Sequence, residues 1–349
     1  MGADFAERVR RWYARNGRSD LPWQCPATPY RVWVSEIMLQ QTRVETVRGY
    51  FERFVQRFPD VRALAAAELD EVLGLWAGLG YYARARNLHR AARRIVAEHG
   101  GEIPADPQAL MALPGIGRST AGAILSLGRG QCHAILDGNV KRVLARHAGI
   151  YGWPGRSAVA RALWGVAEQR TPAVGTAEYN QAMMDLGAMV CLRRPLCGAC
   201  PVAADCHARL HGETDVIPAP KPKQTLPQRE IVALVLQRRD DAAVLLEKRP
   251  PTGIWGGLWS LPEFADEGSL EQWIATRLGG GAPERLSPIE HAFTHFRLRI
   301  HPRRVHLEAP SSIADGAQRD WHRPDAPLGG LPAPIKRLVE RLGADGAGP

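Results

Sequence analysis

The spacing of apolar residues changes once along this chain, and that change limits the folds open to it. From the N-terminus to about residue 211, apolar residues recur every three or four positions, as in 32–58 and 69–78, which predicts amphipathic helices. After residue 228 the spacing alternates, most clearly over 296–308, which predicts strands. Between these regions, 212–228 is rich in Pro and Lys and has no period, as linkers do.

Two domains follow from this pattern. We expect a mainly helical domain over 1–211, a linker over 212–228, and a mixed α+β domain over 229–343 in which 269–279 and 333–343 form helices. The total of 349 residues suits two compact domains.

The overall charge favours a polyanionic partner without naming it, because the formal net charge is +9 at pH 7. No apolar run approaches the ~18 residues that a membrane span needs. The first twenty residues lack the apolar core of a signal peptide. We therefore expect a cytoplasmic protein with no membrane partner.

Four of the six cysteines are crowded into one short stretch. They are Cys191, Cys197, Cys200 and Cys206. A disulfide scaffold would spread its cysteines through a small secreted domain, so this crowding indicates a metal or cluster site. Four thiolates suit tetrahedral zinc or a [4Fe–4S] cluster, and spacing alone favours zinc. Cys25 and Cys132 have no partners at ligand spacing, and we expect them to be structural.

A glycine-containing turn joins two predicted helices at 113–120. Gly115 and Gly117 permit a tight backbone turn whose amides could hold a phosphate oxygen, although ordinary helix connections use glycine too. Asp137 follows at the start of a basic helix that carries Lys141. On its own, such an aspartate is as readily a helix N-cap as a functional group.

Taken together, this turn, Asp137 and the basic helix resemble the signature of the helix-hairpin-helix DNA glycosylase superfamily. The resemblance implies that Asp137 stabilises the oxocarbenium-like sugar left when a base departs. It also implies that Gly115, Gly117, Ser119 and Lys141 contact DNA.

Residues 179–191, which lead into the cysteines, resemble the entry to the iron–sulfur loop of endonuclease III and its adenine-glycosylase relatives. The resemblance implies one [4Fe–4S] cluster on the four cysteines, with zinc less favoured. The usual first spacing is Cys-x6-Cys and here it is one residue shorter, so we expect the loop to follow a different path. Arg193 and Arg194 suit contact with the DNA backbone.

Two positions distinguish a resemblance to endonuclease III from a resemblance to the adenine glycosylases. Endonuclease III resemblance implies a lysine nucleophile where this chain has Ser119, and serine cannot form a Schiff base. The segment 35–42 closely resembles the adenine DNA glycosylase (MutY) family. Glu36 lies there among apolar neighbours that would raise its pKa. The resemblance implies that Glu36 protonates N7 of adenine and then helps to activate water.

Further DNA contacts are implied by the same resemblance. Gln40, Gln41 and Tyr81 match the wedge and intercalating positions that fill the space left by a flipped base. Arg84 would contact phosphate. Trp23, Gln24 and Gln181 would line the adenine pocket.

Residues 247–264 resemble the start of a Nudix-type domain, but 263–279 lack the acidic residues that hold Mg²⁺ in a Nudix hydrolase. We therefore expect a recognition domain. Phe293, Thr294 and His295 match the loop that probes 8-oxoguanine in this family, with Thr where Ser is usual.

The expected activity is removal of adenine mispaired with 8-oxoguanine or guanine in double-stranded DNA, by a monomer and without a lyase step. Two alternatives stay open from the sequence. One is an endonuclease III-like glycosylase/lyase for oxidised pyrimidines, which Ser119 and Glu36 disfavour. The other is a non-catalytic redox-sensing reader of DNA damage, which would need no acid at Glu36.

Overall fold

The computed structural model describes residues 2–222, 225–251, 253–293, 295–308, 318–323, 326 and 330–345. The chain forms two compact units. The first contains Met1–Ala66 and Asn87–Lys223, and the second contains Ala67–Arg86 and Gln224–Pro349. Thus a short segment of the predicted helical half groups with the C-terminal half.

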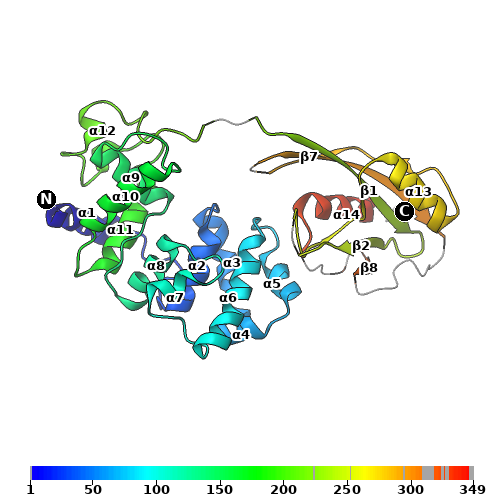
Figure 1. Ribbon diagram of the computed structural model, residues 1–349, viewed down its shortest axis with the longest axis horizontal. Helices are drawn as coiled ribbons and strands as arrows, with labels where there is room; N and C mark the ends of the chain where they lie inside the picture. Colours follow the sequence, from blue (N-terminus) through cyan, green and yellow to red (C-terminus); the bar gives the residue numbers. More distant parts are fainter. Residues whose placement is uncertain are drawn as a thin grey trace. The chain divides into compact units, whose positions relative to one another are not determined.

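Helices build the first unit (Figure 1). They are α1 (Gly2–Asn16), α2 (Pro29–Leu39), α3 (Val44–Arg57), α4 (Val61–Ala66), most of α6 (Ala83–His99), α7 (Pro107–Met111), α8 (Arg118–Arg129), α9 (Gly138–Ala148), α10 (Ser157–Arg170), α11 (Thr176–Met189) and α12 (His207–Leu210), with a 3-10 turn at Cys197–Ala199. The helical pattern predicted from the sequence is therefore confirmed for this unit.

Local chemistry fixes where α2 begins. The Thr28 side chain accepts a hydrogen bond from the Arg31 amide, and Pro29 occupies the first turn, where a missing N–H costs nothing. The helix then buries Val34, Ile37 and their apolar neighbours against α3 and α8. As a result α2 is held firmly along the length that carries Glu36.

Two glycines allow the helices around the first unit's cavity to approach closely. A Cβ on Gly128 of α8 would lie 2.8 Å from the Pro29 Cα at the start of α2. A Cβ on Gly187 of α11 would lie 2.6 Å from the Cβ of Asn139 in α9. Any larger side chain would push these helices apart, so both glycines set the distance between the elements that carry the site.

The second unit combines α5 (Leu69–Trp76) with a mixed sheet and two further helices. The strands are β1 (Gln228–Arg238), β2 (Val244–Lys248), β3 (Trp259–Ser260), β4 (Glu263–Phe264), β5 (Glu284–Arg285), β6 (Ile289–Ala292), β7 (Arg297–Leu307) and β8 (Arg319–His322), and the helices are α13 (Glu267–Leu278) and α14 (Ala333–Asp345). Figure 1 shows α13 and α14 on opposite sides of the long strands.

The sheet has the order β3-β2-β1-β7-β5, with β4 paired to β1, β6 to β7 and β8 to β2. Strands β1 and β7 run parallel, in register from Gln228 opposite Arg297 to Arg238 opposite Leu307. Alternate apolar residues of β1, such as Leu234 and Leu236, pack with Leu270 of α13. Successive side chains of a strand point to opposite faces, and the run 232–237 of β1 is buried throughout.

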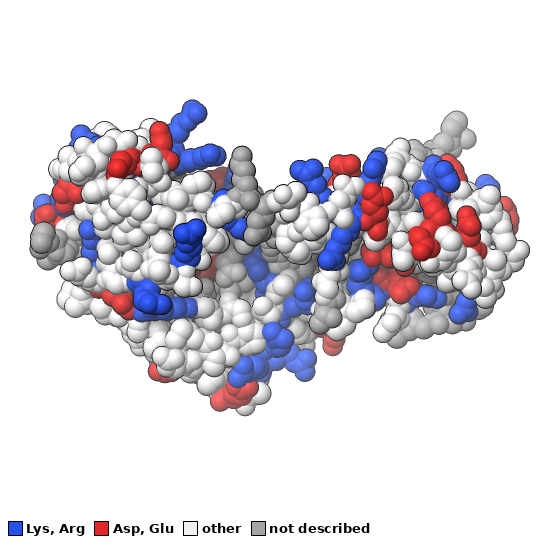
Figure 2. Space-filling view, turned by 45° about the horizontal axis from the view of Figure 1, so that its top comes forward, with Lys and Arg blue, Asp and Glu red and all other residues white. Residues whose placement is uncertain are grey.

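Charge on the surface is mixed. Figure 2 shows Lys and Arg side chains on both units, with Asp and Glu side chains interleaved among them. On the face shown, charge does not single out one binding surface, and a cavity locates the candidate site instead. Within the described residues, no helix is both long enough and apolar enough to span a bilayer.

Candidate active site

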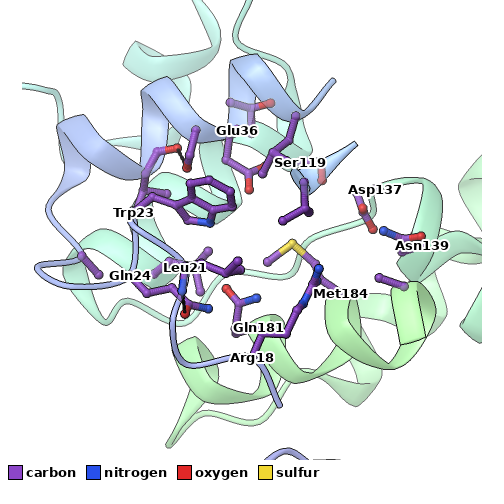
Figure 3. A pocket seen from close by; sticks show the side chains of 18 of the residues that line it. Arg18, Leu21, Trp23, Gln24, Glu36, Ser119, Asp137, Asn139, Gln181 and Met184 are labelled. Atoms are coloured by element: carbon purple, nitrogen blue, oxygen red, sulfur yellow. Dashed lines mark hydrogen bonds between the residues drawn. The ribbon is translucent and has the colours of Figure 1, made fainter. Parts of the chain in front are cut away.

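A cavity of about 1040 Å³ opens in the first unit, between α2, α8, α9, α11 and the loop that precedes α2. In Figure 3, Glu36 enters it from α2 and Asp137 from the start of α9, with Ser119 between them and Gln181 and Met184 on the far side. Many of the residues predicted from the sequence line this one cavity. They are Trp23, Gln24, Glu36, Gln40, Gln41, Ser119, Asp137, Lys141 and Gln181.

Glu36 is a cavity residue whose pKa is strongly raised. Burial, and after it the nearby charge of Asp137, raises the pKa of the Glu36 carboxyl to about 8. Its neighbours Val34 and Ile37 are buried, so little water reaches the carboxyl except through the cavity. At neutral pH Glu36 therefore carries a proton, which a general acid requires.

Asp137 is the N-cap of α9. Its Oδ1 accepts a hydrogen bond of 2.7 Å from the Val140 amide. Burial raises the pKa of the Asp137 carboxyl, while amide hydrogen bonds from Val140 and Asn139 and the charges of Arg142 and Lys141 act in the opposite direction. The two roles of this aspartate are thus compatible, because the cap fixes a carboxyl that also faces the cavity.

Ser119 lies beside the segment that leads to Asp137. Its hydroxyl oxygen accepts a hydrogen bond of 2.9 Å from the Leu136 amide. The contact anchors the residue immediately before Asp137. Ser119 thereby helps to position the carboxylate, a link that the sequence does not reveal.

One wall of the cavity rests on an ion pair that sequence reasoning missed. The Arg18 guanidinium donates hydrogen bonds of 2.6 and 3.2 Å to Oδ1 of Asp185, which is fully buried. Gln181 donates to the same oxygen at 3.1 Å. This bond turns the Gln181 amide so that its carbonyl oxygen can accept from a base amino group. The sequence does offer one signal, since Asp185 interrupts the otherwise apolar run 182–190.

Gln24 and Trp23 form another part of the wall. The Gln24 amide oxygen accepts from the Leu21 amide at 3.3 Å, while its buried Nε2 has no hydrogen-bond partner among the described residues. A buried donor without a partner is costly, and a base with a ring acceptor would satisfy it. Trp23 is 6% exposed and packs edge-on against Phe51 at 5.5 Å.

The glycine turn has the predicted conformation. Gly115 has φ of +82°, which L side chains rarely adopt, and Gly117 is the exposed N-cap of α8. The first amides of α8 therefore lie at an accessible helix N-terminus. Neither glycine lines the cavity.

Backbone strain coincides with predicted contact residues. Among the described residues other than glycine, positive φ occurs at Gln41 (61°), Tyr81 (50°), Ala242 (55°) and Trp255 (54°). Such conformations cost about 1–3 kcal/mol each and concentrate at functional sites. Gln41 and Tyr81 are two of the three predicted wedge residues.

Arg84 is buried, whereas a residue that only contacts phosphate would be exposed. The side chain is 8% exposed and donates to the carbonyl oxygens of Leu79 (3.2 Å) and Gly80 (3.0 Å). Its guanidinium lies 5.5 Å from the centre of the Tyr81 ring. The guanidinium supports the loop that carries Tyr81, and contact with DNA stays a prediction.

The four clustered cysteines line one small cavity in the first unit, together with Arg146. Arg146 Nη1 donates to Cys191 Sγ at 3.4 Å, and burial raises the pKa of the Cys200 thiol to about 11. Within the described residues, no three His, Cys, Asp or Glu side chains meet at a point where a single metal ion would bind. Four sulfur donors around one cavity are the donor set of a [4Fe–4S] cluster.

In the second unit, aromatic rings gather around Phe293. Its ring stacks on Phe296 at 4.4 Å and lies 5.4 Å from Trp255 and 4.6 Å from His291. His295 packs against Phe296 at 4.8 Å. Thr294 lies outside the described residues.

Comparisons with known proteins agree with this architecture. Residues 34–169 match the family model of HhH-GPD superfamily base excision DNA repair proteins, and residues 232–341 match that of the NUDIX domain. A solved thermostable thymine-DNA glycosylase superposes with a TM-score of 0.54 at 26% identity, covering 59% of this chain and 95% of that chain. The fold and site therefore define a base excision DNA repair protein with a Nudix-like second domain, and the predicted fold class is confirmed.

Full-length relatives narrow the class further. The adenine DNA glycosylase of Buchnera aphidicola from Acyrthosiphon pisum is 38% identical over 97% of each chain. The human adenine DNA glycosylase is 36% identical over 88% of this chain and 68% of the human protein. This chain belongs to the adenine DNA glycosylase family.

Proposed function

We propose that this protein hydrolyses the N-glycosidic bond of adenine mispaired with 8-oxoguanine or guanine, as a monofunctional enzyme of base excision repair. One observation carries the proposal: Glu36, with its pKa raised to about 8, shares the wall of a cavity of about 1040 Å³ with Asp137. An acid and a carboxylate on one cavity are what departure of a purine base requires.

The reaction divides between the two groups. Glu36 gives its proton to N7 of the flipped adenine, the bond between C1′ and N9 breaks, and its electron pair leaves with the base. Asp137 stabilises the positive charge that develops on the sugar. Glu36, now ionised, takes a proton from the water that attacks C1′.

Recognition of the base is assigned to the same cavity. Gln24 Nε2 can donate to a ring nitrogen, the Gln181 carbonyl oxygen can accept from the exocyclic amino group, and Trp23 adds apolar surface. Ser119 has no amine, and its hydroxyl already accepts from the Leu136 amide. A covalent lyase step therefore has no nucleophile at this position.

We propose the remaining roles on the same basis. Double-stranded DNA is the partner, contacted by Gln40, Gln41, Tyr81, Arg84, Gly115, Gly117, Ser119 and Lys141, while Phe293, Thr294 and His295 recognise 8-oxoguanine. The protein acts as a cytoplasmic monomer on DNA. Its glycosylase domain covers 1–211, its linker 212–228 and its recognition domain 229–343.

A [4Fe–4S] cluster fits the four cysteines, since all four line one cavity beside the Arg146 guanidinium. When bound, it would fix the loop 191–206 and compensate the negative charge of the thiolates together with Arg146. We expect purified protein to be brown and to contain iron and acid-labile sulfide in equal amounts, because zinc thiolates are colourless and lack sulfide. Colourless protein with one zinc per chain would contradict this assignment.

A panel of duplexes tests the proposed activity. Each carries adenine opposite 8-oxoguanine, adenine opposite guanine, or an oxidised pyrimidine opposite its normal partner. We expect free adenine from the first two and strand breakage only after alkali. Breakage of the third duplex without alkali would favour the endonuclease III-like activity, and release from none of them would favour a non-catalytic reader.

A further inference from the structure

The packing of the segment Ala67–Arg86 could not be predicted from the sequence. It folds with the C-terminal residues in the second unit. The segment contains α5 and the loop that ends in Tyr81, which is 46% exposed and has φ of 50°. Its neighbour Tyr82 is buried. The exposed Tyr81, with its strained backbone, is thus followed directly by the buried Tyr82.

Tyr82 ties this loop to the C-terminal chain through its hydroxyl group. The hydroxyl donates to the carbonyl oxygen of Leu331 at 3.2 Å and accepts from the Gly78 amide at 3.4 Å. Leu331 is 2% exposed. One side-chain oxygen therefore joins the Tyr81 loop to the residues just before α14.

Apolar contact and a second hydrogen bond add to this attachment. A Cβ on Gly330 would lie 2.7 Å from Leu258 Cδ2 and 3.3 Å from the Cβ of Leu73 in α5, so only glycine fits between them. Arg86 Nη1 donates to the carbonyl oxygen of Gly256 at 2.6 Å. Both ends of the segment are thereby held by the C-terminal residues.

An ion pair completes the set, between Lys248 Nζ of β2 and Asp70 Oδ2 of α5 at 2.7 Å. Both side chains are partly exposed, so this pair contributes little on its own. Strained backbone persists only where the surroundings over-determine it. Around Tyr81, those surroundings are the buried side chains of Tyr82, Leu73 and Arg84 and the part-buried bond of Arg86.

We propose that the C-terminal residues position Tyr81 for base extrusion, with the Tyr82 hydroxyl as the main positioning group. The proposal rests on the proposed function, since it assumes that Tyr81 enters the DNA stack. It gives the second unit a role in extruding the adenine, in addition to its proposed role in recognising the 8-oxoguanine opposite. Tyr82 is a positioning residue and does not itself touch the reacting atoms.

The test is a double-mutant cycle in the full-length protein, with single-turnover excision from a duplex holding one adenine:8-oxoguanine pair. Tyr82→Phe removes only the hydroxyl group, and with it the bonds to Leu331 and Gly78. We expect excision to slow by roughly 3- to 10-fold, as loss of buried hydrogen bonding of this kind does. In a Tyr81→Ala background, the same change should alter the rate by less than about twofold, because its target is gone.

Tyr30→Phe is the matched control, since the Tyr30 hydroxyl also donates to a buried carbonyl oxygen, that of Phe58 at 2.7 Å, but in the first unit. Its effect on the rate should be the same in the wild-type and Tyr81→Ala backgrounds. Equal slowing by Tyr82→Phe in both backgrounds would overturn the proposal. So would a Tyr82→Phe rate equal to wild type. Wild-type protein that releases no adenine would instead refute the proposed function.

Discussion

Glu36→Gln should slow single-turnover release of adenine by about 10²–10⁴-fold, the usual contribution of a general acid. Glutamine has nearly the same shape as protonated glutamic acid and can occupy the same place in α2. It cannot transfer a proton to N7, and it cannot take one from water. Because burial and Asp137 keep Glu36 protonated up to about pH 8, the variant removes a proton that is present at neutral pH.

Binding to the mispaired duplex should change far less in this variant, since the replacement is neutral like the acid it replaces. Gel-shift titration and quenched single-turnover reactions on the same duplex measure the two quantities. Glu98→Gln is the matched control, because Glu98 is an exposed glutamate of α6 in the first unit, paired with Arg94, and its loss should leave the rate unchanged. Excision by Glu36→Gln within fivefold of wild type would refute the acid role.

Asp137→Asn should lower the same rate by about 10²–10³-fold, as loss of one pre-organised electrostatic group does. Asparagine is as good an N-cap as aspartate, so its side-chain oxygen can keep the bond from the Val140 amide. Only the negative charge that faces the developing cation is lost. The melting temperature should therefore stay close to that of wild type while the rate falls.

Asp106→Asn supplies the matched control. Asp106 caps α7 by accepting from the Ala109 amide at 2.7 Å, and it does not line the cavity. The substitution makes the same chemical change at a helix start without touching the site. If Asp137→Asn excised adenine at the same rate as the Asp106→Asn control, Asp137 would act only as a helix cap and the electrostatic role would be refuted.

Much of the fold could be predicted from the sequence, because helices and strands depend on the local spacing of apolar residues. Strand β7 was expected within 296–308 and runs over Arg297–Leu307. Its parallel pairing with β1 was not readable, since the two strands are separated by more than fifty residues and register depends on packing between them. The grouping of Ala67–Arg86 with the C-terminal unit is likewise a long-range contact without a local signal.

The catalytic residues of the candidate site could be predicted from the sequence, because each belongs to a local motif. Glu36 and Asp137 are over one hundred residues apart, and the structure brings both to one cavity. The residues that hold the site in place could not be predicted. Asp185 holds Arg18 and Gln181 through contacts between helices, and Arg84 faces loop carbonyls, which depends on how the loop folds.

The pH dependence of single-turnover adenine excision by the wild-type protein tests the central claim most directly. The acid form of Glu36 is the active one, and its pKa is raised to about 8. The rate should therefore be level from about pH 6.5 to 7.5 and fall about tenfold per pH unit well above pH 8. A rate that instead rises with pH through 8 would contradict the account, because it would mean that an ionised group, and not protonated Glu36, begins the reaction.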